Sequence, residues 1–362
     1  MIYFFLHHHP EVGLLKEALL YRRIKNNWVE CRLCARRCKI PPGRRGFCNV
    51  RENKDGTLYT LVYGRVTAFN VDPIAKKPLF HVWPGAFVAS ISTTGCNFRC
   101  IFCDNWHLSQ TSRLYGRPMS PEDIVTYAIK LGADGISYTY NEPTIFFEYM
   151  YDTAKLAKEK GLFNTIVTNG YMSAEATELF SKYLLAATVD FKGCANSDFY
   201  KKFCGVPDVE PIFELLLELK RHGVFIEITN LVVPEYGDKE EDLRRLARWI
   251  IDNLGPDIPF HLLRFFPDFR MTDHYVTPVE KLEKLYEVAK KEGLKYVYIG
   301  NVPGHRYENT YCPACGKLLI SRYGFDIISY NLTSDNRCPE CGEKVPIVGR
   351  FRGRRSPWWG MI

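Results

Sequence analysis

Short apolar runs alternate with helix-like patterns from residue 86 to residue 300, and this alternation limits the folds that the chain can adopt. The expected strands cover residues 86–92, 135–140, 163–168, 187–191, 224–233, 260–265 and 295–300. Helices are expected near residues 144–160, 173–183, 209–222, 238–253 and 278–292, and a further one should begin at Pro121 with Ser120 as its cap. Strands that alternate with helices form a parallel sheet, either open or closed into a barrel. We therefore expect an α/β domain over residues 57–310.

The composition favours a globular protein without a membrane span. Hydrophobic residues make up 46% of the chain, but no run of about 18 apolar residues occurs. The 48 basic and 41 acidic side chains leave a net charge of +7, which permits an acidic partner without requiring nucleic acid. The apolar start before His7, His8 and His9 is too short for a secretion signal. We therefore expect a cytoplasmic protein that needs neither a membrane nor nucleic acid.

The 13 cysteines are clustered. The N-terminal cysteine group is Cys31, Cys34, Cys38 and Cys48, the middle group is Cys96, Cys100 and Cys103, and the C-terminal group is Cys312, Cys315, Cys338 and Cys341. Close C-x2-C pairs in a chain without a secretion signal predict metal sites in a reducing cytoplasm rather than disulfides. The two remaining cysteines, Cys194 and Cys204, are expected to be inert buried thiols.

The middle cysteine group stops at three members. Its C-x3-C-x2-C pattern directly follows the first expected strand, at the carboxyl end where parallel α/β folds place their active sites. Thiolates favour an iron–sulfur cluster or zinc. A [4Fe–4S] cluster normally takes four cysteines, so three would leave one iron free to bind a small molecule. The alternative is a zinc site that a distant residue completes.

The stretch TTGCNFRCIFCDNW, residues 93–106, resembles the cluster motif of radical S-adenosylmethionine (SAM) enzymes. This resemblance implies an α/β fold of the radical SAM type, a partial (β/α)6 parallel barrel. It also implies a [4Fe–4S] cluster on the middle cysteine group, with SAM bound at the iron that lacks a cysteine. Phe102 matches the aromatic residue of that motif, which usually lies against adenine.

Further residues resemble the SAM contacts of relatives of the pyruvate formate-lyase activating enzyme. In YTYNEP, Glu142 would receive the methionine ammonium, with Asn141 beside it. A buried carboxylate needs such a partner. The other cofactor contacts that the resemblance implies, each at the carboxyl end of a strand, are Thr168, Asn169, Asp190, Lys192 and His261. Their order along the chain gives the resemblance its weight, because each one alone is a weak signal.

The C-terminal cysteine group lies in a module over residues 311–349. It forms two C-P-x-C-G knuckles, a pattern similar to a zinc ribbon. Four thiolates close the coordination shell, so a structural zinc is expected and an electron-transfer cluster is the alternative. Residues 350–362 follow as a basic, aromatic tail.

The N-terminal cysteine group lies in a Cys-rich module over residues 1–56. Its C-x2-C-x3-C-x9-C spacing departs from the bacterial ferredoxin pattern, so zinc and an auxiliary [4Fe–4S] cluster both remain open. Arg36, Arg37, Arg44 and Arg45 are interleaved with these cysteines. Directly after this module, apolar and polar residues alternate with period two. This pattern predicts a hairpin at Tyr63–Gly64.

Taken together, CRLCARRCKIPPGRRGFCNVREN, TTGCNFRCIFCDNW, YTYNEP, and YIGNVPG before YCPACG resemble the AmmeMemoRadiSam-system radical SAM enzymes, over roughly residues 17–349. The family name implies Memo-type and AMMECR-type partner proteins. The resemblance implies an anaerobic oxidoreductase that takes electrons from a donor such as ferredoxin or flavodoxin. It would cleave SAM reductively to a 5′-deoxyadenosyl radical, which abstracts hydrogen from an unidentified substrate. The alternative is an activating enzyme that installs a glycyl radical on a partner protein.

Overall fold

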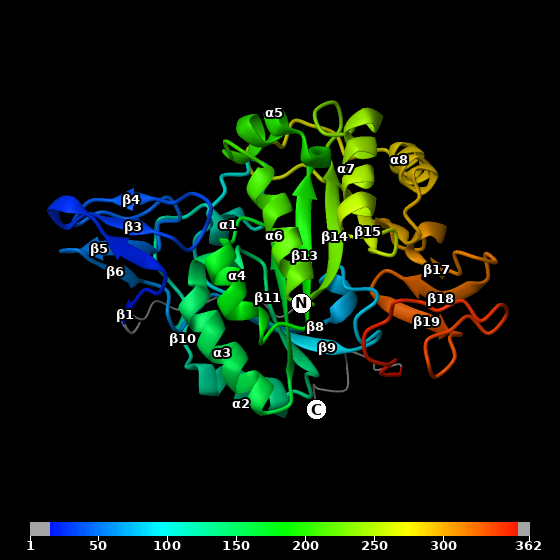
Figure 1. Cartoon of the computed structure of the whole chain (residues 1–362), viewed down its shortest axis with the longest axis horizontal. Helices are drawn as coiled ribbons and strands as arrows, with labels where there is room; N and C mark the ends of the chain where they lie inside the picture. The colour runs from blue at the N-terminus through cyan, green and yellow to red at the C-terminus, as the bar shows by residue number, and fades with distance from the viewer. Residues whose placement is uncertain (1–14, 354–362) are drawn as a thin grey trace.

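The structure is a computed structural model that describes residues 15–353. At its centre lies an eight-stranded sheet with the order β16-β15-β14-β13-β12-β11-β9-β8 (Figure 1). Its parallel strands are β9 (Phe87–Ser92), β11 (Gly135–Tyr138), β12 (Phe163–Thr168), β13 (Ala186–Lys192), β14 (Phe225–Val232), β15 (Phe260–Arg264) and β16 (Val297–Gly300). The remaining strand, β8 (Ala68–Pro73), pairs antiparallel with β9. The parallel sheet predicted from the alternating pattern is thereby confirmed.

The helices follow the strands as the sequence predicts. They are α2 (Pro121–Lys130), α3 (Phe147–Glu159), α4 (Ala174–Ser181), α6 (Glu210–Arg221), α7 (Glu240–Asn253) and α8 (Val279–Glu292), with the short α1 (Trp106–Ser109) and α5 (Ser197–Phe199) in loops. At the start of α2, Ser120 and Asp123 exchange hydrogen bonds between side chain and backbone amide in a capping box. Because the parallel strands are arranged in chain order, right-handed crossovers place the connecting helices on one face of the sheet (Figure 1).

The loop between β8 and β9 covers the opposite, inner face of the sheet. The hydroxyl of Thr188 on β13 donates to the Lys77 carbonyl (2.6 Å), and the His81 amide donates to the Glu227 carboxylate on β14 (2.7 Å). The His81 ring also packs edge-on against Tyr298 on β16. Backbone groups of this loop and the His81 ring therefore pack against the inner face.

Burial of His81 predicts a loss of stability in mild acid. The residue is 0% exposed, and its Nε2 atom lies 2.6 Å from the Tyr298 hydroxyl. Burial lowers the pKa of His81 from 6.5 to about 4, although the Glu227 carboxylate opposes this shift. Between these two pH values the unfolded chain binds a proton that the folded chain excludes. The folded state is therefore destabilised as the pH falls through this window.

We expect this group alone to lower the free energy of unfolding by about 2 kcal/mol between pH 7 and pH 5. The variant His81→Gln cannot bind the proton, so its stability should fall by about that much less over the same range. Urea titrations of both proteins at the two pH values measure the difference. Equal losses in the two proteins would contradict the prediction.

Two small sheets form the N-terminal module. One joins β1 (Lys16–Glu17), β6 (Thr57–Thr60) and β5 (Arg51–Lys54), and the other joins β2 (Tyr21–Arg23), β3 (Val29–Cys31) and β4 (Lys39–Ile40). The expected boundary between the Cys-rich module and the α/β domain lies after residue 56. Strand β6 follows this boundary, yet it pairs with β5, which lies before the boundary. The boundary therefore falls within a hairpin.

The hairpin predicted at Tyr63–Gly64 is wrong, because the turn lies at Asp55–Gly56 between β5 and β6. Both turn residues have positive φ angles, 50° and 88°. An Asp-Gly pair adopts such angles at low cost in a two-residue hairpin loop. The strand that follows Gly64, β7 (Arg65–Val66), pairs instead with β10 (Arg117–Pro118).

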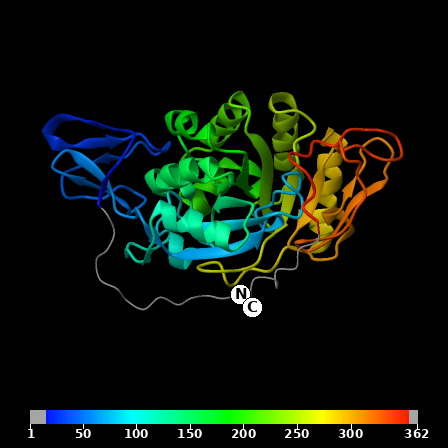
Figure 2. The ribbon, with the colours of Figure 1, turned by 90° about the horizontal axis from the view of Figure 1, so that it is seen from below.

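The C-terminal module is a three-stranded antiparallel sheet of β17 (Thr310–Tyr311), β18 (Leu318–Tyr323) and β19 (Asp326–Tyr330). The two modules lie at opposite ends of the central sheet (Figure 2). The expected tail is described to residue 353, and Phe351 stacks on Tyr330 there. The rest of the tail and the histidine run lie outside the described residues. Within residues 15–353, no helix is long and apolar enough to cross a membrane.

Candidate functional site

The middle cysteine group forms a turn directly after β9. The side-chain amide of Asn141, in the loop after β11, donates to the Gly95 carbonyl (2.9 Å) and so holds the start of this turn. Gly95 has a φ angle of 96°, and a Cβ at this position would lie 2.6 Å from the Cys48 carbonyl oxygen. Both observations require glycine here. The turn is therefore packed directly against the N-terminal cysteine group.

Among the described residues, the three sulfurs of the middle group do not meet the spacing that a single metal ion requires. A zinc ion holds its thiolates about 3.8 Å apart, given Zn–S bonds of about 2.3 Å and tetrahedral geometry. Among the described residues, the C-terminal cysteine group has all its sulfurs within 4.8 Å of one another, and the middle group does not. Each thiolate of a [4Fe–4S] cluster binds a different iron, which sets the sulfurs farther apart. The spacing therefore disagrees with one tetrahedral zinc ion, and the cluster on these cysteines stays a prediction.

Without a metal, deprotonation of the three cysteines in this turn is energetically unfavourable. Burial, with smaller effects of Glu142 and Cys100, raises the pKa of Cys96 well above its usual value. A hydrogen bond with the Cys204 thiol and burial raise the pKa of Cys100 in the same direction. Burial and Cys100 raise the pKa of Cys103 to about 11. Coordination to iron would remove this cost, because a metal ligand is held as the thiolate.

Glu142, in the loop after β11, presents a buried carboxylate with neutral donors. Its Oε1 atom accepts hydrogen bonds from the Thr144 amide (3.0 Å), the Thr144 hydroxyl (2.5 Å) and the Thr168 hydroxyl (2.8 Å). Its Oε2 atom accepts from the Asn169 amide (2.8 Å). Burial raises the pKa of Glu142 even though these hydrogen bonds oppose it. The carboxylate is thus fixed in place and still suited to bind a cation.

Asn169 connects Glu142 to the cysteine turn. Its side-chain amide donates to the Asn97 side chain (2.8 Å), and the same nitrogen lies 3.9 Å from the Cys96 sulfur. The structure therefore brings together Glu142, Thr168, Asn169 and the middle cysteine group, which lie far apart in the sequence. Their contacts with SAM stay predictions.

Asp190 and Lys192 lie at the carboxyl end of β13. The Lys192 ammonium donates to the Asp190 carboxylate (2.7 Å), whose other oxygen accepts from the Thr229 hydroxyl (2.7 Å). Burial lowers the pKa of Lys192, but the charges of Asp190 and Cys100 outweigh burial and raise it. Lys192 is therefore a permanent cation near the cysteine turn.

His261 lies elsewhere than expected. It is the second residue of β15 and so sits near the amino end of that strand rather than the carboxyl end. Its Nε2 atom bonds to the Glu227 carboxylate (2.8 Å), and its ring stacks on Tyr298. A buried imidazole needs a polar partner, and Glu227 on the neighbouring strand supplies one. The expected position is wrong, and a contact of His261 with SAM stays a prediction.

Two aromatic rings and a cysteine surround the turn. Phe102 packs against Phe199 and Phe265, with ring centres 5.8 and 6.2 Å away. Cys204 is fully buried, and its carbonyl accepts from the Arg99 amide within the turn (2.8 Å). Its thiol is close enough to Cys100 to raise the pKa of that cysteine. No sequence pattern predicts this contact, because Cys204 belongs to no cysteine motif and lies about 100 residues after the turn.

A second polar cluster without a sequence motif lies on the inner face. Lys77 is 2% exposed and donates to the Asp72 carboxylate (2.8 Å), which also accepts from the Tyr140 hydroxyl (2.5 Å). Burial lowers the pKa of Lys77 to about 8, although Asp72 opposes this shift. A buried lysine with such a pKa can hold or release a proton near neutral pH.

The C-terminal cysteine group forms a compact site. Cys312 and Cys341 have their sulfurs 3.5 Å apart, and Cys315 and Cys338 have theirs 3.7 Å apart. These distances match the spacing of about 3.8 Å that tetrahedral zinc imposes. The group can therefore hold one metal ion.

Comparisons with known proteins agree with this geometry. The model of the radical SAM superfamily matches residues 90–250, a segment that contains the cysteine turn, Glu142 and Lys192. An uncharacterized protein of Methanocaldococcus jannaschii is 48% identical over 92% of this chain and 100% of that protein. A putative glycyl-radical enzyme activating enzyme of the same organism is 31% identical over 61% of this chain and 89% of that protein. The pyruvate formate-lyase-activating enzyme of Clostridium pasteurianum is 25% identical over 54% of this chain and 87% of that protein.

Proposed function

The chain belongs to the radical SAM superfamily, and from this premise we propose that it cleaves SAM reductively at a [4Fe–4S] cluster on the middle cysteine group. Such a cluster supplies the electron that breaks SAM into methionine and a 5′-deoxyadenosyl radical, which abstracts hydrogen from a substrate still to be identified. The observation that supports the proposal most is the close association of this cysteine turn with a buried carboxylate that has only neutral donors.

The surrounding side chains have defined roles in this proposal. Glu142 receives the methionine ammonium, because its carboxylate is buried and still has capacity to accept a charged donor. Lys192 pairs with the methionine carboxylate, and Asp190 holds the Lys192 side chain in position. Asn169 orients both Glu142 and the cysteine turn. Phe102 offers an apolar surface to adenine.

Glycyl-radical activation is the second candidate function. It is favoured by the likeness to two proteins named as activating enzymes. In this case the hydrogen would come from a glycine of a partner protein, and an EPR doublet on that partner would report it. For either function we propose a low-potential electron donor such as ferredoxin or flavodoxin. The resemblance to the AmmeMemoRadiSam system, through the name of that family, adds Memo-type and AMMECR-type proteins as proposed partners.

The variant Glu142→Gln tests the proposed SAM site. We expect it to raise the Kd for SAM by roughly 10- to 100-fold, because hydrogen bonds to charged groups contribute about 1.5–3 kcal/mol. Its iron content should match that of the wild type, because Glu142 is not a cluster ligand. Equilibrium binding and chromatography of 5′-deoxyadenosine under anaerobic, reducing conditions measure both effects. A wild-type protein that binds iron but never cleaves SAM would overturn the proposed function.

We also propose that the C-terminal cysteine group holds a structural zinc. The variant Cys312→Ser should lose about one zinc per chain and make the C-terminal module sensitive to proteases, because four thiolates close this site. SAM cleavage should persist, since the module lies at the other end of the sheet from the N-terminal module, against which the cysteine turn packs. Elemental analysis and limited proteolysis give the readout. Iron in place of zinc at this site would refute the assignment.

A further inference from the structure

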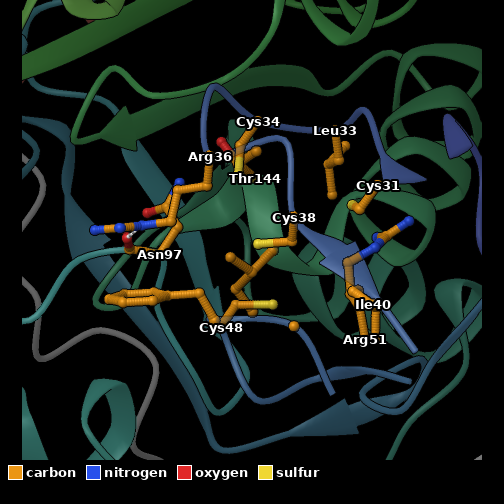
Figure 3. Close-up of a pocket in the computed structure, with 13 residues that line it drawn as sticks. Cys31, Leu33, Cys34, Arg36, Cys38, Ile40, Cys48, Arg51, Asn97 and Thr144 are labelled. Atoms are coloured by element: carbon orange, nitrogen blue, oxygen red, sulfur yellow. Dashed lines mark hydrogen bonds between the residues drawn. The ribbon is translucent and has the colours of Figure 1, made fainter. Parts of the chain in front are cut away.

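We infer that the N-terminal cysteine group holds an iron–sulfur cluster and not zinc. Figure 3 shows its four side chains around one cavity, to which the end of β3, the loop to β4 and the loop before β5 contribute. Although all four line this cavity, their sulfurs do not satisfy the 4.8 Å limit that the C-terminal group meets. The C-terminal group shows how closely four sulfurs lie at a site sized for one zinc ion. The four sulfurs of the N-terminal group do not lie that close together. A cluster does not require the sulfurs to converge on one ion, because each thiolate binds a separate iron.

The wall of the cavity supports the same assignment. Arg36 lines it and donates to the backbone carbonyls of Asn97 and Gly205. Because these acceptors are carbonyls and not carboxylates, the guanidinium keeps its charge available to offset the negative charge of a cluster with four thiolates. The apolar part of the wall, which excludes water from a cluster, comes from Leu33, Ile40, Phe47 and Ile145.

The cavity adjoins the middle cysteine group. Asn97, the neighbour of Cys96, is one of its lining residues, and Gly95 packs against the Cys48 carbonyl. The Phe47 ring also contacts the guanidinium of Arg99 within the turn (4.2 Å). One electron from a low-potential donor protein would reduce the N-terminal cluster and then pass to the middle cluster, which leaves the N-terminal cluster oxidised again. Only this transfer step rests on the proposed function.

Metal analysis of a chain that lacks the middle group tests the assignment directly. The triple variant Cys96→Ala, Cys100→Ala, Cys103→Ala, purified anaerobically, should retain about four iron and four sulfide per chain, as one [4Fe–4S] cluster requires. Adding Cys31→Ser and Cys48→Ser should remove that iron. The matched control adds Cys194→Ser, a buried thiol of neither group, and should leave the iron in place. Zinc without iron in the triple variant would overturn the inference.

The wild-type protein separates this inference from the proposed function. About eight iron per chain supports both clusters, whereas equal iron in the wild type and the triple variant refutes only the cluster of the middle group. The reduced wild type should also give an EPR spectrum broader than the sum of the spectra of the two variants that each lack one group, because neighbouring spins interact. A simple sum of those spectra would contradict the transfer step while the iron count still decides the assignment.

Discussion

The variant Cys100→Ser is expected to lower 5′-deoxyadenosine formation by more than about 100-fold, because replacing groups that merely support a metal ligand already costs roughly 10- to 100-fold. The variant Cys204→Ser is expected to keep most of the activity. Both cysteines are buried, and the Cys204 thiol is close enough to raise the pKa of Cys100, so the same chemical change is made at neighbouring positions. In the proposed site Cys100 is a ligand and Cys204 is not, since the fourth iron must stay open to SAM.

Chromatography of 5′-deoxyadenosine under anaerobic, reducing conditions gives the rates, and an iron count accompanies each protein. Zinc in the C-terminal cysteine group serves as the control for folding, because that group lies in a separate module. If Cys204→Ser lost activity and iron as fully as Cys100→Ser, Cys204 would be a fourth ligand. The cluster would then be closed, and the proposed SAM site would be wrong.

The α/β domain could be predicted because each of its elements has a local cause. The run at residues 163–168 is rich in β-branched residues, and it forms β12 with the predicted bounds. The N-terminal module has no comparable pattern, since its strands are two to four residues long. There the Asp55–Gly56 pair, which is a strong hairpin signal, outweighs the period-two pattern around Tyr63.

The candidate site also contains residues that the sequence could predict and residues that it could not. The cysteine turn, Glu142 and Lys192 belong to short motifs, so their chemistry can be predicted from neighbouring residues. Cys204 contacts the cysteine turn, and Tyr140 contacts the Lys77–Asp72 pair, only because residues distant in the sequence are brought together by the fold. The choice between zinc and a cluster at the outer cysteine groups depends on distances between sulfurs, which residue spacing does not determine. The carboxyl-end position expected for His261 came from the resemblance, although His261 is only the second residue of the predicted strand 260–265; its partner Glu227 lies on the neighbouring strand and has no local sequence signal.

The second large effect is expected at the ion pair of Arg51 and Glu148, whose side chains are 2% and 1% exposed. The Arg51 guanidinium donates to both carboxylate oxygens of Glu148 (2.9 and 2.8 Å). Arg51 lies on β5 and Glu148 on α3, so the pair joins the N-terminal module to the α/β domain. The variant Glu148→Gln should lower the free energy of unfolding by about 3–5 kcal/mol, because it leaves a buried charge without its counter-charge.

The double variant Arg51→Met, Glu148→Leu removes both charges and replaces them with apolar side chains. It should cost less stability than Glu148→Gln alone, because no buried charge remains unpaired. Anaerobic urea titrations of the three proteins measure this order. Arg51 also lines the N-terminal cavity, so metal content should be followed in the same samples. A double variant less stable than Glu148→Gln would contradict this prediction and show that packing, rather than the pairing of the two charges, joins the module to the domain.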